Sequence, residues 1–120
     1  QRQMCIRDSN RISASTLAGV LATVARGTTP DLAPIASGLP VAGFTGTLAD
    51  RFTGPDEVAA GYVRAKTGTL TGVTSLAGMV PDASGRMLVF ALLANGIPSI
   101  DRARALGDDF AAGLASCGCR

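Results

Sequence analysis

Apolar residues recur at helical spacing near both ends of the chain. The first such stretch is preceded by serines and followed by Gly27 and Pro30, and the second follows Ser99. Serine caps helix N-termini, whereas glycine with a later proline ends a helix. We therefore expect helices over residues 13–26 and 99–116. Their expected core-facing residues are Leu17, Val20, Leu21 and Val24 in the first helix and Ala103, Leu106, Phe110 and Leu114 in the second.

Between the helices the pattern changes to three apolar runs of strand length. These runs are residues 61–69, 73–80 and 87–94. Gly72 separates the first two, and the turn-forming run PDASGR separates the last two, which predicts an antiparallel meander. Residues 27–57 are rich in Gly, Pro, Thr and Asp and are expected to make a long ordered excursion over the surface. The pattern predicts an α+β fold, an antiparallel sheet with flanking helices.

Composition narrows the class of protein. The 120 residues suffice for one domain, and 47% are apolar but only 4% are aromatic, so aliphatic side chains must build the core. The net charge of +2 is spread along the chain without a basic run, which argues against a nucleic-acid or membrane-surface partner. No apolar run approaches the roughly 20 residues of a transmembrane helix.

The chain contains no histidine, which excludes Ser/His/Asp and Cys/His triads and most zinc sites that use imidazole. Cys5 stands alone, and Cys117 and Cys119 are too close together for an easy bridge between them. We read the two C-terminal cysteines as a solvent-facing tail and expect no metal and no cofactor.

Lys66 is the only lysine, against ten arginines, and it lies in the run RAKTGTLTGV. An ordinary surface lysine with its stem on apolar neighbours is one interpretation. The other is a site for an anion or a peptide, because an ammonium, two hydroxyls and a glycine that leaves the backbone accessible fall within four residues. A phosphate loop is excluded, since Ala60 and Ala65 stand where that motif requires glycine.

Lys66, Thr67 and Gly68 form K-T-G, a signature of active-site-serine penicillin-recognising enzymes. The wider sequence resembles the C-terminal part of the peptidase S13 D-alanyl-D-alanine carboxypeptidases, the low-molecular-mass class C penicillin-binding proteins. The resemblance covers roughly residues 10–116 and rests on the segments NRIS, LPVAGFTGTLADRF, VRAKTGTLTGVTSLAGMV and GRMLVFALLAN. It implies the C-terminal part of a β-lactamase/transpeptidase-like domain, located outside the cytoplasm. The implied partners are peptidoglycan stem peptides ending in D-Ala-D-Ala and β-lactams.

The resemblance also implies roles for five residues. Lys66 would direct positive potential toward a serine and the substrate's terminal carboxylate, while the Thr67 and Thr69 hydroxyls would hydrogen-bond that carboxylate. The Thr69 N–H would form half of the oxyanion hole. Gly68 would keep the strand clear for the peptide, and Leu70 would border the pocket for the penultimate side chain. Simple pleating places Lys66 and Thr69 on opposite faces, and an edge position or strand twist must reconcile them.

The family's nucleophile motif S-x-x-K is missing, because Val63 stands three residues before the only lysine. Ser9 and Asn10 do not form S-x-N, since no residue stands between them. Residues 1–9 match no part of the family pattern, so we read them as a leader foreign to the fold and residues 10–120 as the domain part. The chain alone is expected to be inactive. Two alternatives stay open: another serine penicillin-recognising enzyme, such as a β-lactamase or esterase, and a non-catalytic wall-binding module.

Overall fold

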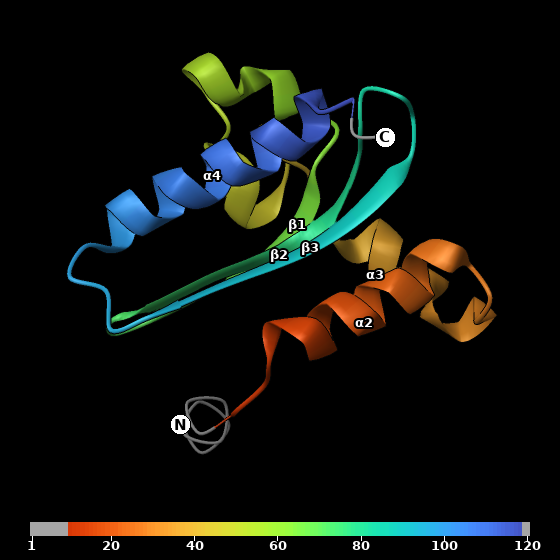
Figure 1. Ribbon diagram of the computed structural model, residues 1–120, viewed down its shortest axis with the longest axis horizontal. Helices are drawn as coiled ribbons and strands as arrows, with labels where there is room; N and C mark the ends of the chain where they lie inside the picture. Colours follow the sequence, from red (N-terminus) through yellow and green to blue (C-terminus); the bar gives the residue numbers. More distant parts are fainter. Residues whose placement is uncertain (1–9, 119–120) are drawn as a thin grey trace.

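The computed structural model describes residues 10–118, which form a three-stranded antiparallel sheet with helices on both faces (Figure 1). The predicted strands and the two long helices are confirmed, with ends that differ by at most three residues. They are α2 (Ala14–Arg26), β1 (Arg64–Leu70), β2 (Val73–Pro81), β3 (Met87–Asn95) and α4 (Ile100–Ser116). The expectation for the leader, residues 1–9, lies outside the described residues.

Both long helices begin at the serines that the sequence suggests. The Ser13 hydroxyl accepts a hydrogen bond from the Thr16 N–H at 3.1 Å, and the Ser99 hydroxyl accepts one from the Arg102 N–H at 3.3 Å. Each bond satisfies one of the N–H groups that a helix start leaves unpaired. Gly27 ends α2 in the left-handed conformation, at φ 65°, which costs glycine little.

The sheet has the order β1-β2-β3, so β1 and β3 are its edge strands. Register runs without interruption from the pair Arg64 and Met79 to the pair Leu70 and Val73 in the first hairpin. Asp82 closes the second hairpin, because its carboxylate accepts the N–H groups of Ser84 and Arg86, each at 2.9 Å. The outer edge of β3 is paired by no residue in the described range.

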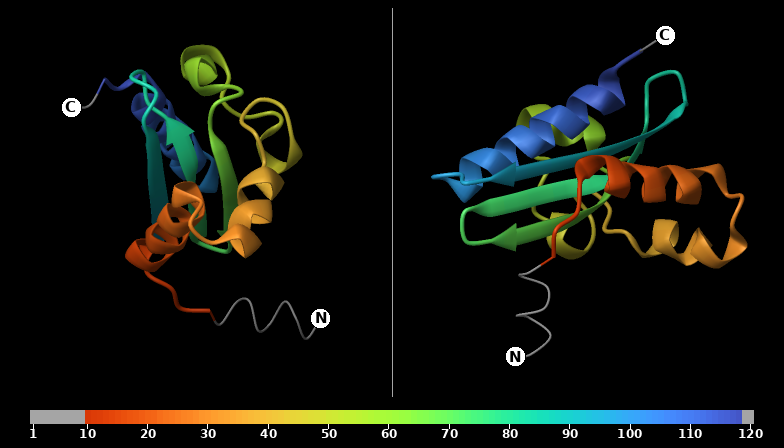
Figure 2. Two further views of the ribbon diagram at one scale, coloured as in Figure 1. Left: turned by 90° about the vertical axis from the view of Figure 1, so that its right-hand side faces the viewer. Right: turned by 60° about the horizontal axis from the view of Figure 1, so that its bottom comes forward.

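The two faces of the sheet are covered by different helices, as Figure 2 shows. α4 packs on one face over the larger cluster of buried residues, which includes Leu76, Val80, Phe90 and Ala111. α2 packs on the other face over a smaller cluster of Leu21, Val24 and Met79. The chain is therefore a three-layer arrangement in which the sheet lies between α2 and α4.

The buried face of α4 is only partly the one expected from the sequence, since Leu114 packs against the core as expected. Gly107, Asp108, Ala111 and Ala112 face inward, whereas Leu106 and Phe110 are exposed. Small side chains let the helix approach the sheet closely, so that a Cβ added at Gly107 would lie 3.5 Å from Leu92. In α2, the expectation that Val20 faces the core is also wrong, because Val20 is exposed, whereas Leu21 and Val24 are buried as expected.

The segment between α2 and β1 contains short helices, namely η1 (Pro30–Leu32), α3 (Ala33–Gly38), η2 (Gly46–Leu48) and η3 (Gly54–Ala59). The sequence predicts a path over the surface, but Ala42, Leu48, Phe52 and Ala59 are buried in the cluster under α4. Backbone hydrogen bonds also fix the segment to the start of β1, since Ala42 donates to the Val63 carbonyl at 2.9 Å. Part of the expected excursion is therefore core.

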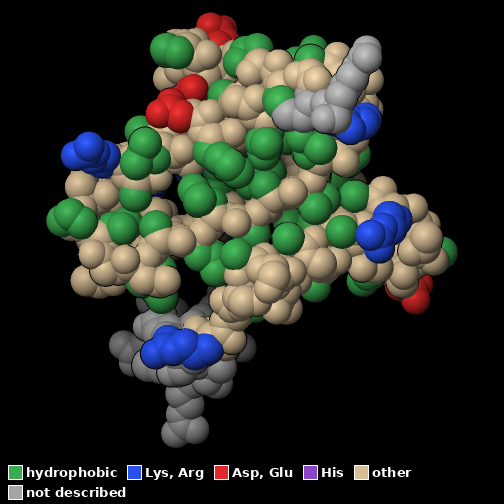
Figure 3. Space-filling view, in the orientation of Figure 1, with side chains coloured by type: hydrophobic (Ala, Val, Ile, Leu, Met, Phe, Trp, Pro, Cys, Tyr) green, Lys and Arg blue, Asp and Glu red, His purple; other side chains and the backbone are tan. Residues whose placement is uncertain are grey.

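Several large apolar side chains of the described residues are exposed. Figure 3 shows hydrophobic side chains gathered across the middle of one face, and Met87, Leu106 and Phe110 are among the large apolar residues that are exposed.

Cys117, expected in a plain solvent-facing tail, is disulfide-bonded. Within residues 10–118 no helix has the length and apolar character needed to cross a membrane.

Candidate active site

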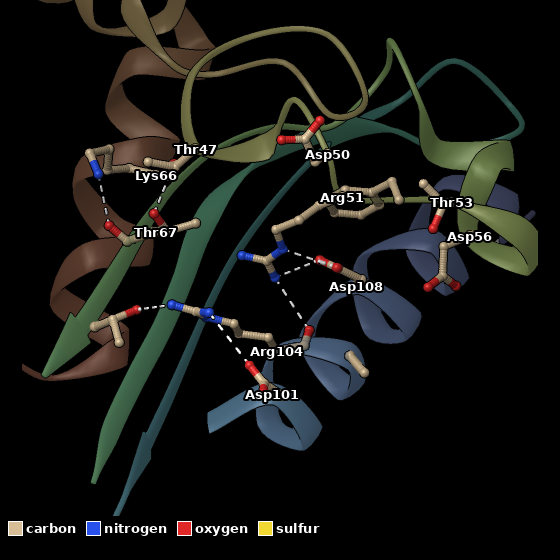
Figure 4. Close-up of a pocket in the computed structure, with 13 residues that line it drawn as sticks. Thr47, Asp50, Arg51, Thr53, Asp56, Lys66, Thr67, Asp101, Arg104 and Asp108 are labelled. Atoms are coloured by element: carbon tan, nitrogen blue, oxygen red, sulfur yellow. Dashed lines mark hydrogen bonds and ion pairs between the residues drawn. The ribbon is translucent and has the colours of Figure 1, made fainter. Parts of the chain in front are cut away.

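A cavity of about 770 Å³ lies between the edge strand β1, the segment from η2 to η3, and the first half of α4. β1 contributes Lys66, Thr67 and Thr69, as Figure 4 shows for the first two. The opposite walls carry six charged side chains from the segment and the helix: Asp50, Arg51, Asp56, Asp101, Arg104 and Asp108. The cavity is thus polar and is built from three separate parts of the chain.

The outer edge of β1 is open beside this cavity. Ala65 donates its N–H away from β2, to the Pro40 carbonyl at 3.0 Å, while the Gly68 carbonyl accepts the Thr74 hydroxyl of β2 at 3.3 Å. Because peptide groups alternate along a strand, those of Thr67 and Thr69 point outward as that of Ala65 does. No described residue pairs with the Thr69 N–H, so this donor is available to a ligand.

Lys66 lies on this open edge and is exposed. Its ammonium donates to the Thr67 carbonyl at 2.9 Å, so the side chain bends around the strand toward the outer edge. Lys66 and Thr69 therefore both line the cavity, although the pleat places them on opposite faces of the sheet. Because β1 is an edge strand, side chains from both of its faces can reach the cavity. The edge position, one of the two explanations considered from the sequence, therefore accounts for the placement of Lys66 and Thr69.

The two threonine hydroxyls are already hydrogen-bonded. Thr67 donates to the Thr47 hydroxyl of η2 at 2.8 Å, and the Thr69 hydroxyl accepts from Nη2 of Arg104 at 3.3 Å. A ligand that accepts from Thr67 would have to replace Thr47 as the acceptor. Thr69 retains its own hydrogen for donation, because an oxygen that accepts one bond can still donate.

Gly68 and Leu70 do not line the cavity. A Cβ at Gly68 would lie 2.5 Å from the Ser75 hydroxyl, so packing of β1 on β2 also favours glycine here. Leu70 is exposed at the end of β1, where it pairs with Val73. Of the five residues singled out in the sequence, the structure brings together Lys66, Thr67 and Thr69.

An ion pair fixes the wall opposite β1. Arg51 contacts Asp108 through Nη2 at 2.6 Å and Nε at 3.0 Å, and the two side chains are 17% and 11% exposed. The following residue, Phe52, is buried and has φ 60°, and the backbone bends directly after Arg51. The ion pair thus joins the segment to α4 in the wall of the cavity opposite β1.

Sequence reasoning did not identify Thr47, Arg51, Arg104 or Asp108. Arg104 and Asp108 are four residues apart on a predicted helix, a spacing that places them on one face. That signal was present but does not indicate which face meets the cavity.

A further acidic group lines the cavity at η3. Burial, and then the nearby Asp109 carboxylate, raise the pKa of Asp56 above its ordinary value. The Asp56 carboxylate is therefore protonated at a higher pH than an ordinary aspartate. Positive charge is held near β1 by Lys66 and Arg104, while Asp50 and Asp56 lie across the cavity (Figure 4).

Comparison with known sequences gives one family. The model of the D-Ala-D-Ala carboxypeptidase 3 (S13) family matches residues 6–114. Carboxypeptidase DacB of Mycolicibacterium smegmatis is 47% identical over 112 residues, which cover 92% of this chain and 24% of that protein. The D-alanyl-D-alanine carboxypeptidase of Actinomadura sp. is 39% identical over 92 residues, covering 72% of this chain and 16% of the relative. The chain therefore spans a quarter or less of these relatives.

Solved structures give the same result for the fold. Penicillin binding protein 4 of Haemophilus influenzae, complexed with a novel beta-lactam, superposes with a TM-score of 0.70 at 30% identity. The match covers 88% of this chain and 25% of that protein. The described residues thus have the fold of one part of a penicillin-binding protein.

Proposed function

Because the chain belongs to the D-Ala-D-Ala carboxypeptidase 3 (S13) family, we propose that it forms the K-T-G wall of a serine carboxypeptidase active site. The substrate is a peptidoglycan stem peptide that ends in D-Ala-D-Ala, and β-lactams occupy the same place. The 120 residues contain no S-x-x-K motif. The serine nucleophile and its lysine base therefore come from sequence outside them. The complete protein acts outside the cytoplasm, where this substrate is found.

The observation that supports this proposal most strongly is the convergence of groups at the open edge of β1. The Lys66 ammonium, the Thr69 hydroxyl and the outward-facing Thr69 N–H lie beside one cavity. An acyl transfer needs a positive site for the substrate's carboxylate and an N–H donor for the developing oxyanion. β1 offers both within four residues.

In the proposed reaction the serine oxygen attacks the carbonyl carbon of the bond between the two D-alanines, and its proton passes to the lysine base. The Thr69 N–H donates to the carbonyl oxygen as it becomes an oxyanion. The C–N bond then breaks, the departing D-alanine nitrogen takes up a proton, and an ester to serine remains for water to hydrolyse. Lys66, Thr67 and Thr69 hold the terminal carboxylate throughout the acylation step.

Exposed apolar residues agree with a nucleophile supplied from elsewhere. Met87 at the start of edge strand β3, and Leu106 and Phe110 on α4, are exposed in the described residues. Exposed apolar surface of this kind is usually covered by another part of a protein. A segment of the longer protein that covers them would lie on the β3 side of the sheet, across from the edge of β1 that borders the cavity.

The test is acylation of the full-length protein that carries this segment. Incubation with a fluorescent penicillin should label it covalently on a serine outside residues 1–120, and the protein should release D-alanine from an acetylated D-Ala-D-Ala peptide. The 120-residue chain, as the matched control, should form no adduct. Rapid β-lactam turnover without D-alanine release would indicate a β-lactamase, and reversible binding without an adduct would indicate a wall-binding module.

A further inference from the structure

Arg104 holds the Thr69 side chain from the far side of the cavity. It lies on the second turn of α4, and its Nη2 donates to the Thr69 hydroxyl at 3.3 Å. Figure 4 shows the guanidinium extending from the helix toward β1. This contact links residues 35 positions apart and places a second cation beside the K-T-G strand.

The charge of Arg104 is only weakly neutralised. Its Nη1 lies 3.6 Å from the Asp101 carboxylate, which is 96% exposed and therefore mostly screened by water. Arg51, in contrast, forms two hydrogen bonds with the buried Asp108. Among the cations around the cavity, Lys66 and Arg104 are therefore the two whose charge is available to an anion beside Thr69.

The backbone that carries Arg104 is fixed by the same ion pair. Arg51 donates from Nη2 to the Arg104 carbonyl at 3.3 Å while it contacts Asp108 one turn later. The first half of α4 is therefore tied to the segment that forms part of the wall opposite β1. An arginine on a tethered turn loses less freedom when it binds than one on a free helix end.

The direction of the bond between Arg104 and Thr69 matters for ligand binding. A guanidinium can only donate, so the Thr69 oxygen is the acceptor and its hydrogen is left to point elsewhere. That hydrogen can be given to an anion at the open edge of β1. By donating to the Thr69 oxygen, Arg104 thus favours the orientation in which the Thr69 hydroxyl acts as a donor toward the ligand.

We propose that Arg104 is a positioning residue that orients the Thr69 hydroxyl and makes the site selective for a peptide with a free terminal carboxylate. The inference rests on the proposed function and adds to it a residue outside the K-T-G strand. If Arg104 serves only to hold α4 on β1, its loss will lower kcat/KM for all substrates alike. If it serves the carboxylate, its loss will lower kcat/KM only for substrates that carry a terminal carboxylate.

The experiment compares two peptides in the full-length protein: acetylated D-Ala-D-Ala and the same peptide ending in D-alaninamide. The measured quantity is the ratio of kcat/KM for the two. Arg104→Ala should lower this ratio about tenfold, the size expected for one charge-assisted hydrogen bond. Arg104→Lys should restore part of the ratio, because it keeps the charge and a donor. Arg102→Ala, an exposed cation on the same helix, is the control and should leave the ratio unchanged.

Each outcome separates the two proposals. If the wild-type protein cleaves both peptides but Arg104→Ala keeps the wild-type ratio, the role of Arg104 is structural and the inference is wrong. An equal fall in both kcat/KM values also contradicts the inference, because it leaves the ratio unchanged. If the wild-type protein cleaves neither peptide and takes up no penicillin, the proposed function itself is wrong, and the inference falls with it.

Discussion

Arg51 and Asp108 form a two-point ion pair, with contacts of 2.6 and 3.0 Å, between residues 57 positions apart. The pair joins the segment before β1 to α4. Neither side chain is more than one-fifth exposed, at 17% and 11%. Removing one partner leaves the other charge in a site with little water.

Asp108→Ala should therefore lower the free energy of unfolding by about 3–5 kcal/mol, the usual cost of an uncompensated buried charge. Arg51→Met alone should cost a similar amount. The double variant should cost less than the sum, because it leaves no unpaired charge. Urea unfolding of the four proteins measures this, and strictly additive losses would show that the pair does not act as a unit.

Gly78→Ala should displace β1. A Cβ there would fall against the Arg64 carbonyl and 2.6 Å from Cα of Ala65, so the backbone of β1 must move. We expect a loss of about 1–3 kcal/mol or more, as for other overpacked sites. The control is Gly113→Ala in α4, where no neighbour lies within 4 Å and stability should rise by about 0.5–1 kcal/mol. Equal effects of the two substitutions would contradict the close approach of β1 and β2.

Acid should remove the contribution that the Asp82 carboxylate makes to the stability of the fold. The Ser84 hydroxyl first, and then the N–H and side chain of Arg86, lower the pKa of Asp82 from 3.8 to about 2. A lowered pKa in the folded state means that the carboxylate stabilises the fold above its ordinary pKa. This contribution is complete at pH values above about 4 and is lost as the pH falls through about 2.

The measurement is the stability difference between wild type and Asp82→Asn from pH 7 to pH 2. It should stay constant down to about pH 5 and shrink between about pH 4 and 2. Asp31→Asn, at an exposed carboxyl on η1, is the control. A difference that does not change with pH would show that the turn does not favour the charged form of Asp82.

Lys66→Ala should slow acylation of the full-length protein by penicillin by roughly a hundredfold or more, since it removes charge from the carboxylate site. Arg64→Ala is the matched control, because Arg64 is exposed on the same strand but does not line the cavity. Stopped-flow measurement of adduct formation distinguishes the two. An equal rate for Lys66→Ala and wild type would exclude Lys66 from the site.

The sequence predicts those parts of the molecule that depend on local signals. Ser13, Gly27 and Ser99 mark helix ends through bonds with near neighbours, and the observed ends agree. The pattern predicts part of the buried face of α4 wrongly, because hydrophobic spacing favours large residues such as Phe110, whereas close packing on the sheet selects small ones such as Ala111.

The site divides in the same way. Lys66 and Thr67 stand out in the sequence because they are adjacent and chemically unusual, and the resemblance to S13 enzymes extends from this run to segments on both sides of it. Arg51 and Arg104 do not stand out, since a chain with ten arginines gives no reason to select these two. Only the fold brings them to the cavity.

The hydrogen bond from the Ala65 N–H to the Pro40 carbonyl also limits how much of the outer edge of β1 is free for a ligand. It occupies the outer edge of β1 on one side, and the turn at Gly72 ends the strand on the other. Between these limits only the peptide groups of Thr67 and Thr69 face outward, and they are about 6.6 Å apart along the strand. A longer peptide gains no further pairing from this strand, and Pro40 blocks its path in one direction. The outer edge of β1 therefore offers backbone pairing to no more than a short extended stretch of any ligand.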